Sequence, residues 1–397
     1  MDFDFNRPPE ASNRLGKHWY AGGLFELDFI ADRDLELRRE FEEDVATLEP
    51  RLDVALAYEP SPRVSAFAQL ELSHEFILED EAELLDPPET RLTVEQAYLT
   101  FNEILPGLSM QVGRQLFEDD RDWWYREELD AVRLFYRTER FGVEFSASRL
   151  ELVGDDFLNR DEPQRTNNLF LIGRYAYRED AEFDAYVFKQ DDRAEDEEED
   201  PLFLGVRSIG ELGSDFEHWV DAAIVRGTDD GRDIRAYGFD AGITYEPDLR
   251  FDPLFTVGAA FGSGDSDPDD DVDQAFRQTG FQQSFYYYGE VLAPELSNLW
   301  VLTAGASMYV TDSLSAGFLY HYYEQHRAAD ELRNAFIFED PDGVDKHLGQ
   351  ALDFVFSYYG AGGLYADLIL GSFYPGDAFP DDAPTAYFGE FIIGYQF

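Results

Sequence analysis

Residues 384–397, PTAYFGEFIIGYQF, decide the fold class of this chain of 397 residues. Read at a period of two, one set of side chains is largely apolar and the other is mixed. The apolar set is Tyr387, Phe391, Ile393, Tyr395 and Phe397; the mixed set is Phe388, Glu390, Ile392, Gly394 and Gln396. A strand of a soluble sandwich can show the same alternation. Here it recurs along nearly the whole chain in segments of about ten residues, which predicts a transmembrane β-barrel.

The composition is compatible with this fold. The chain is 16% aromatic, has no cysteine and has a mean hydropathy of -0.41. No apolar run approaches the roughly 20 residues that a membrane helix needs. A barrel keeps its mean hydropathy low because the lumen side of each strand is polar. We therefore predict one domain over residues 1–397, with residues 1–18 as a periplasmic lead-in from which any secretory signal has been removed.

The chain is strongly acidic, with a formal net charge of -53. Only Lys17, Lys189 and Lys346 are lysines, and the acids crowd into loops such as residues 191–201, DDRAEDEEEDP. One interpretation is an acidic surface for cations or basic partners. The simpler one is solvation in a salty habitat.

Long and short connections alternate between the predicted strands. Short turns fall near 59–63 and 105–107, and longer connections cover 118–128 and 263–297. Bacterial barrels place short turns and both termini on the periplasmic side, which requires an even number of strands. We predict about eighteen antiparallel strands in up-and-down order. This number requires residues 286–298 to belong to the long connection, because a strand there would make it odd.

Motifs of catalysis are missing from the sequence. There is no nucleophile elbow, no H-E-x-x-H, no phosphate-binding loop and no dinucleotide-binding glycine pattern. The six histidines are scattered, and paired carboxylates carry little information in so acidic a chain. The sequence predicts neither an enzyme nor a nucleic-acid partner.

One acidic loop has the spacing of a candidate calcium site. In residues 262–276, GSGDSDPDDDVDQAF, aspartates fall at every second position: Asp265, Asp267, Asp269, Asp271 and Asp273. Oxygen ligands at such spacing suit Ca²⁺, but the glycine and terminal glutamate of an EF-hand are missing. A solvated acidic loop is the simpler interpretation, and no other cofactor is predicted.

Several arginines fall on inward positions of the predicted strands. In residues 130–138, DAVRLFYRT, the apolar alternation sends Arg133 and Arg137 inward, and it does the same for Arg174 and Arg207. A charge on the lipid face at mid-depth costs about 2–4 kcal/mol, which favours this placement. Simple alternation puts Arg114 outward, unless Gly113 marks a bulge that turns it inward.

Two interpretations of the inward arginines stay open. Arginines in a constriction select anions by pairing with carboxylates or phosphates. Alternatively, they pair with carboxylates of the barrel wall. These acids share the inward phase: Asp53, Glu71, Glu144, Asp184, Asp221, Asp240, Asp353, Asp367 and Glu390.

Three blocks of the sequence resemble the alginate-export porins of Gram-negative outer membranes. They are VGRQLFEDDRDWWYREELDAVR at 112–133, GAAFGSGDSDPDDDVDQAFRQTG at 258–280 and YYYGEVLAPELSNLWVLTAG at 286–305. The resemblance implies a monomeric eighteen-stranded barrel that passes polyuronate through an arginine-rich constriction. It assigns Arg114, Arg133, Arg174 and Arg277 to the pore or its loop supports, and Trp123 and Trp124 to a folded loop at the mouth.

The sequence and the resemblance together predict a passive outer-membrane export channel for anionic polysaccharide, with lumen arginines guiding the carboxylates. Outer-membrane lipid surrounds such a barrel, and periplasmic export components are a further candidate partner. The inward phases, however, carry more acids than arginines. Two alternatives therefore remain: a porin whose acidic lumen favours cations or neutral sugars, and an adhesion or structural barrel plugged by its loops.

Overall fold

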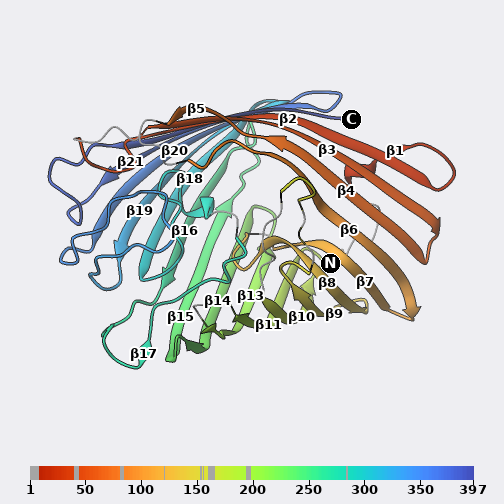
Figure 1. The fold of residues 1–397 in the computed structure, drawn as a ribbon, viewed down its shortest axis with the longest axis horizontal. Helices are drawn as coiled ribbons and strands as arrows, with labels where there is room; N and C mark the ends of the chain where they lie inside the picture. Colours follow the sequence, from red (N-terminus) through yellow and green to blue (C-terminus); the bar gives the residue numbers. More distant parts are fainter. Residues whose placement is uncertain are drawn as a thin grey trace.

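A computed structural model describes residues 9–39, 44–80, 85–119, 121–152, 154, 156–159, 166–193, 198–282 and 285–397. Within these residues, eighteen long antiparallel strands close into a barrel around a lumen (Figure 1). The long strands are β2 (Trp19–Arg33), β3 (Val45–Ser61), β4 (Val64–His74), β6 (Thr90–Leu105), β7 (Leu108–Glu118), β8 (Arg126–Arg137), β9 (Phe141–Arg149), β10 (Asn167–Arg178), β11 (Ala181–Arg193), β13 (Leu202–Glu211), β14 (Phe216–Asp229), β15 (Arg232–Tyr245), β16 (Leu254–Gly262), β18 (Leu299–Thr311), β19 (Leu314–Gln325), β20 (His347–Tyr359), β21 (Leu364–Pro375) and β22 (Ala386–Gln396).

Short elements complete the described fold. They are η1 (Pro9–Ala11), β1 (Asn13–Arg14), β5 (Phe76–Asp80), β12 (Glu198–Glu199), β17 (Val272–Asp273) and η2 (Tyr286–Tyr288). The predicted absence of a strand in 286–298 is confirmed, because η2 is followed by turns until Leu299.

The barrel closes between its first and last long strands. Residues Leu24 to Arg33 of β2 pair antiparallel with Gln396 to Tyr387 of β22. The backbone of Gly23 also exchanges hydrogen bonds with that of Phe397. The C-terminus therefore lies beside the start of β2, at the end of the barrel that carries the short turns. Residues 1–8 of the predicted lead-in lie outside the described residues.

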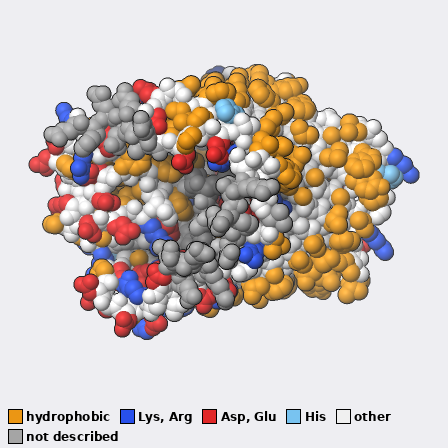
Figure 2. Space-filling model, in the orientation of Figure 1, with side chains coloured by type: hydrophobic (Ala, Val, Ile, Leu, Met, Phe, Trp, Pro, Cys, Tyr) orange, Lys and Arg blue, Asp and Glu red, His pale blue; other side chains and the backbone are white. Residues whose placement is uncertain are grey.

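Side chains alternate between the two faces of the wall as the sequence predicted. Outward residues of β8 such as Val132 and Tyr136 are exposed to the surroundings, whereas Ala131 and Phe135 are buried on the inside. Figure 2 shows hydrophobic side chains gathered over a broad part of the surface, with acidic and basic side chains toward the other end. This is the pattern of a lipid-facing belt next to charged loops. The described part of the chain contains no helix long and apolar enough to cross a membrane.

Candidate functional site in the barrel lumen

Two connections fold into the lumen and share a hydrophobic core with its wall. The first joins β7 to β8 and contains Trp123 and Trp124; the second joins β16 to β18. The Trp124 ring is 1% exposed and lies 5.1 Å from the Phe203 ring and 5.7 Å from the Phe188 ring, measured between centroids. Trp123 stacks on Phe276 of the second connection at 5.8 Å. The two tryptophans thus anchor both connections inside the barrel.

Side-chain amides join the two connections. The Gln278 and Gln282 amides donate to the Trp123 carbonyl at 2.6 and 2.8 Å. The Thr279 hydroxyl donates to the Trp124 carbonyl. Since all these groups are buried, each bond satisfies a polar atom that would otherwise be costly to bury. The two connections therefore behave as one packed unit.

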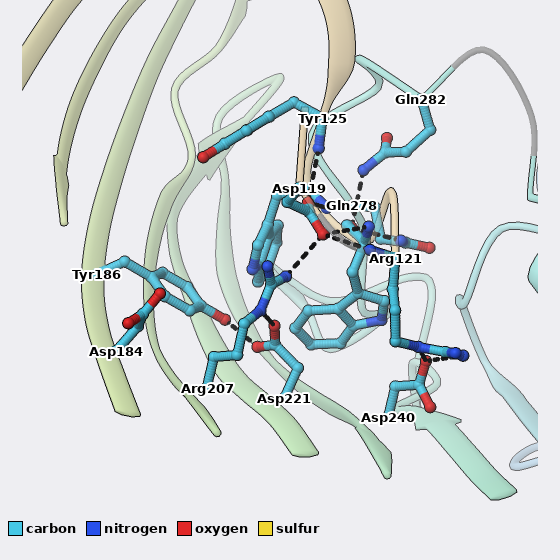
Figure 3. Close-up of polar contacts among 12 residues, drawn as sticks. Asp119, Arg121, Tyr125, Asp184, Tyr186, Arg207, Asp221, Asp240, Gln278 and Gln282 are labelled. Atoms are coloured by element: carbon cyan, nitrogen blue, oxygen red, sulfur yellow. Dashed lines mark hydrogen bonds and ion pairs between the residues drawn. The ribbon is translucent and has the colours of Figure 1, made fainter. Parts of the chain in front are cut away.

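Asp119 organises the first connection (Figure 3). Its carboxylate accepts the backbone N–H groups of Trp123, Trp124 and Tyr125 at 3.1, 2.7 and 3.2 Å. It also accepts a hydrogen bond from Arg207 Nη2 at 2.8 Å. Asp119 thus folds its own loop and ties that loop to β13.

An inward row of charged residues crosses five neighbouring strands. Each residue of the row is the cross-strand partner of the next one on the adjacent strand: Arg174, Asp184, Arg207, Asp221 and Asp240. We call this set the inner charge row. Arg174 Nε lies 3.3 Å from Asp184, and Arg207 Nε lies 2.5 Å from Asp221. Tyr186 also donates its hydroxyl to Asp221. The three neighbouring pairs of opposite sign stabilise the wall, whereas Asp221 and Asp240 are neighbours of like charge.

Arg133 extends the same pattern on β8. Its Nη2 lies 2.7 Å from Glu144, which also lies 3.9 Å from Arg174 Nη2. Its guanidinium also stacks 4.1 Å from the centre of the Phe117 ring. Arg133, Arg174 and Arg207 therefore face inward and pair with wall carboxylates, as the second interpretation of the arginines predicts.

Arg114 and Arg137 lie apart from this row. The register passes through Gly113 without a shift and pairs Arg114 with Ala97 and Asp130, on the outward phase of Val112 and Val132. The expected bulge is therefore absent from both ladders. Arg114 is buried where the pairing of β6 with β7 ends, and its Nη2 lies 3.3 Å from Asp130.

Arg137 is the last residue of β8 and is half-buried beside the short turn to β9.

Gly113 has a backbone requirement of its own. Its φ is +129°, and a Cβ would lie 2.1 Å from the Ala97 carbonyl oxygen. Only glycine tolerates both conditions.

Arg277 supports the second connection from within. It is 1% exposed and contacts three carboxylates, those of Glu199, Asp229 and Asp273. Asp229 lies 2.7 Å from Nη1. Three negative charges around one buried cation fix this loop to β12 and β14 and leave Arg277 no access to a solute.

The acidic loop forms no metal cluster among the described residues. Arg232 Nη2 lies 2.6 Å from Asp265, and Arg277 pairs with Asp273 at the other end of the series. Within the loop, the Asp267 backbone N–H donates to Asp265 Oδ1 at 3.4 Å, and Asp267 Oδ1 accepts the Asp269 backbone N–H at 3.3 Å. The calcium prediction gains no support from this geometry.

A cavity of about 350 Å³ lies beside the packed loops. Arg121 Cζ lies 4.2 Å from the centre of the Trp219 ring and 4.6 Å from that of Tyr287. Its Nη2 lies 3.1 Å from Asp240, which also accepts the Trp219 Nε1–H at 2.8 Å. Arg126, whose side chain is 53% exposed, lines the same cavity. The cavity thus combines two arginines, their partners Asp240 and Asp122, and the faces of aromatic rings.

Glu290 lines this cavity from the second connection. Burial, together with the nearby carboxylates of Asp353 and Glu390, raises its pKa from 4.5 to about 8. Burial also raises the pKa of Tyr287. At neutral pH the Glu290 side chain is therefore largely protonated and adds little negative charge to the cavity.

A second charged cluster, of one arginine and three carboxylates, surrounds Arg51 on β3. Arg51 Nη2 lies 2.6 Å from Glu26, and Nε lies 3.4 Å from Asp53 and 3.6 Å from Glu71. Three carboxylates thus share one cation, so this part of the wall stays acidic. Sequence reasoning did not single out Arg51, although Leu52 and Val54 on the outward phase place it inward.

The cavity residues Arg121, Arg126, Trp219 and Tyr287 were also missed. Trp219 lies on the inward phase of β14, which the sequence could have indicated. Arg121 and Tyr287 depend on how their connections fold into the lumen, and Arg126 is the first residue of β8, where the first connection ends. Alternation gives no signal for these three positions.

A closed barrel of eighteen strands, with an apolar belt outside and charged loops packed inside, defines a bacterial outer-membrane channel protein. Two solved structures of Pseudomonas aeruginosa share this fold. OccK5 (OpdH) aligns over 95% of this chain and 97% of its own, with a TM-score of 0.63 and 10% identity. OccK11 (OpdR) aligns over 95% of both chains, with a TM-score of 0.61 and 12% identity.

Sequence comparison defines the family. Residues 25–388 match the alginate export family model, so the chain belongs to the alginate export family. The alginate production protein AlgE of Pseudomonas aeruginosa is 24% identical over 352 residues, which cover 72% of this chain and 70% of that protein. AlgE of Pseudomonas syringae pv. tomato is 21% identical over 341 residues, covering 69% and 68%. The predicted family, fold and outer-membrane location are confirmed.

Proposed function

We propose that this channel passes an anionic polysaccharide of the alginate-like polyuronate class out of the cell passively, as a monomer, and that it catalyses no reaction. The cavity beside the packed loops carries the proposal. A uronate unit offers one carboxylate and an apolar C–H face. Arg121 and Arg126 match the carboxylate, which would replace Asp240 and Asp122 as their partners. The rings of Trp219 and Tyr287 match the apolar face.

The arginines predicted from the sequence take supporting roles in this proposal. Arg133, Arg174 and Arg207 line the wall, and a passing carboxylate would have to compete with Glu144, Asp184 and Asp221 for them. Arg277 supports a loop.

Arg114 and Arg137 lie away from the inner charge row. We therefore expect both to influence the shape of the passage more than its contacts with the polymer.

A specific observation favours one alternative function. The carboxylates around Arg51 outnumber their cation, which suits a porin for cations or neutral sugars. The two functions differ in ion selectivity and in their response to polymer.

Single-channel recording in a planar bilayer tests the proposal. Under a KCl gradient, polymannuronate added to one side is expected to block the current at micromolar concentration. The double variant Arg121→Gln/Arg126→Gln is expected to weaken block about tenfold or more, since each lost charge-assisted hydrogen bond is worth about 1.5–3 kcal/mol. The matched control is Arg250→Gln, in the short turn between β15 and β16, which should leave block unchanged.

Three results would contradict the proposal. Cation selectivity without block would favour the small-solute porin. Absence of any conductance would favour a loop-plugged adhesion or structural barrel. Equal block of the double variant and the unchanged protein would show that the polymer does not bind in this cavity.

A further inference from the structure

A row of basic side chains lies on the outer face of the barrel, near the loop ends of β9 to β15. It consists of Arg149, Lys189, Arg226 and Arg235, and we call it the outer basic row. Neighbours on the same phase face outward: Val187, Ile224 and Tyr237 are 37%, 40% and 52% exposed. The residues next to Arg226 and Arg235 on the opposite phase, Val225 and Ala236, are fully buried.

The strand register places three of these residues side by side. Lys189 pairs with Leu202, Leu202 with Arg226, and Arg226 with Arg235. Adjacent strands are about 4.8 Å apart, so the three cations lie within about 15 Å along the wall. Arg149 continues the row on β9. It lies two residues beyond Ala147, whose cross-strand partner Leu169 is exposed on the outer face, so Arg149 has the same outward phase.

The row is unusual in a chain of net charge -53. Arg226 and Arg235 lie directly opposite each other, and Arg235 Nη2 also lies 3.0 Å from Asp233, with both of these side chains 59% exposed. Arg226 donates to the Val225 and Ala236 carbonyls at 2.7 and 3.3 Å, and among the described residues no carboxylate pairs with it. In contrast, Arg133, Arg174 and Arg207 in the lumen all pair with acids.

Arg149 is a second outward cation for which the described residues supply no paired carboxylate. Its Nε is buried and forms no hydrogen bond with the residues that the structure describes. It lines an open hollow of about 770 Å³ together with the outward apolar residues Val132, Ala147 and Leu169. Three acids, Asp130, Asp191 and Asp200, also line the hollow; Asp130 pairs with Arg114, and Asp200 pairs with Lys189. The hollow therefore has an apolar floor and a basic upper edge.

We propose that this surface binds the phosphorylated glycolipid of the outer leaflet, lipopolysaccharide. The outer basic row lies at the boundary between the apolar belt and the charged loops, the depth at which lipid headgroups lie. Arginine forms paired hydrogen bonds with phosphate oxygens, and a phosphate beside Arg226 supplies the counter-charge that no described carboxylate gives it. The exposed Leu169, Val187 and Ile224 below the row contact acyl chains. An otherwise acidic protein thereby gains local attraction for an anionic lipid.

Lipid binding to the purified full-length barrel in a neutral detergent tests this inference. The probe is fluorescent bisphosphorylated lipid A, compared with dephosphorylated lipid A and with phosphatidylglycerol. Arg149→Gln/Arg226→Gln is expected to weaken binding about a hundredfold, about tenfold for each lost charge-assisted hydrogen bond. Arg178→Gln/Arg250→Gln removes two charges at the opposite end of the barrel and is expected to bind as the unchanged protein does.

Equal binding by the Arg149/Arg226 variant and the unchanged protein would overturn the inference. Equal affinity for dephosphorylated lipid A would show an apolar contact only, and equal affinity for phosphatidylglycerol would show a general anionic surface; either result also overturns it. Heat-modifiable gel migration reports whether each barrel is folded. If the double variant does not fold, Arg149→Gln and Arg226→Gln are tested singly, each with an expected loss of about tenfold.

Discussion

Replacement of Asp119 by alanine should release the first lumen connection without opening the barrel. The carboxylate accepts three buried backbone N–H groups, those of Trp123, Trp124 and Tyr125, as well as one from Arg207. A buried donor left without its acceptor costs about 1–3 kcal/mol. Arg207 keeps Asp221 as a partner, so the backbone groups dominate. We estimate a local loss of about 3–5 kcal/mol, toward the lower end of the sum for three such donors.

Hydrogen exchange measured by mass spectrometry gives a direct readout. A loss of about 3 kcal/mol or more corresponds to an increase of roughly 10²-fold or more in the exchange of the Trp123, Trp124 and Tyr125 amides, if exchange proceeds by local opening. Peptides from the strands should keep their protection, and the open channel should become noisier.

A neighbouring carboxylate, Asp122, provides the control for Asp119→Ala. Asp122→Asn changes a carboxylate of the same loop that forms a partly exposed ion pair with Arg126 at 3.4 Å, so it should change exchange only slightly. An increase of less than about threefold in the Asp119→Ala variant would refute the anchoring role. Equal loss of protection in the strands would show that Asp119 stabilises the whole barrel instead.

Three further predictions concern the lumen. Burial raises the pKa of Glu290 to about 8, so the docked state of its loop should be fully stable below the ordinary pKa of 4.5 and should weaken as pH rises through 8. Channel noise should therefore increase from pH 6 to 9. The Glu290→Gln variant should not show that increase. Arg277→Gln leaves three carboxylates around an uncharged group, which should lower the local stability of residues 272–282 by about 3–5 kcal/mol and speed their hydrogen exchange accordingly. Unchanged exchange would contradict the role of Arg277 as a loop support. Arg51→Gln removes the cation shared by Glu26, Asp53 and Glu71, so the reversal potential under a KCl gradient should shift toward cation selectivity. A shift toward anion selectivity would refute the assignment of an acidic wall.

The wall of this barrel was predictable from the sequence because its signal is local. Val132 and Tyr136 report the lipid face, and the same period of two then places Arg133 inward. The even strand number also followed from one local decision, that residues 286–298 contain no strand, and the structure confirms it.

The lumen contents were harder to predict because they depend on contacts between distant segments. Asp119 stands in the acidic run EDDRD, where nothing distinguishes it from Asp122. Its role depends on Arg207, which lies 88 residues away. Arg114 shows a different failure: alternation placed it correctly on the outward phase, but the expected bulge was wrong, and the end of the β6–β7 pairing buries it instead. Periodicity identifies a face, whereas burial also depends on which segment covers that face.

The net charge of this protein is a poor guide to what its lumen conducts. At physiological ionic strength the Debye length is ~8 Å, so exposed loop acids farther than that from the passage are largely screened. Within the lumen, most charges cancel in pairs: Arg133 with Glu144, Arg174 with Asp184, Arg207 with Asp221. Cancellation is incomplete at the acids around Arg51, where three carboxylates share one cation. Arg126 is about half exposed and lies 3.4 Å from Asp122, so its ion pair is open to solvent and to exchange of partner. An acidic exterior and a path for a polyanion are therefore compatible, provided that the polymer passes on the side of Arg121 and Arg126, away from the acids around Arg51. Neutralising the external loop acids should consequently alter polymer block much less than Arg126→Gln does.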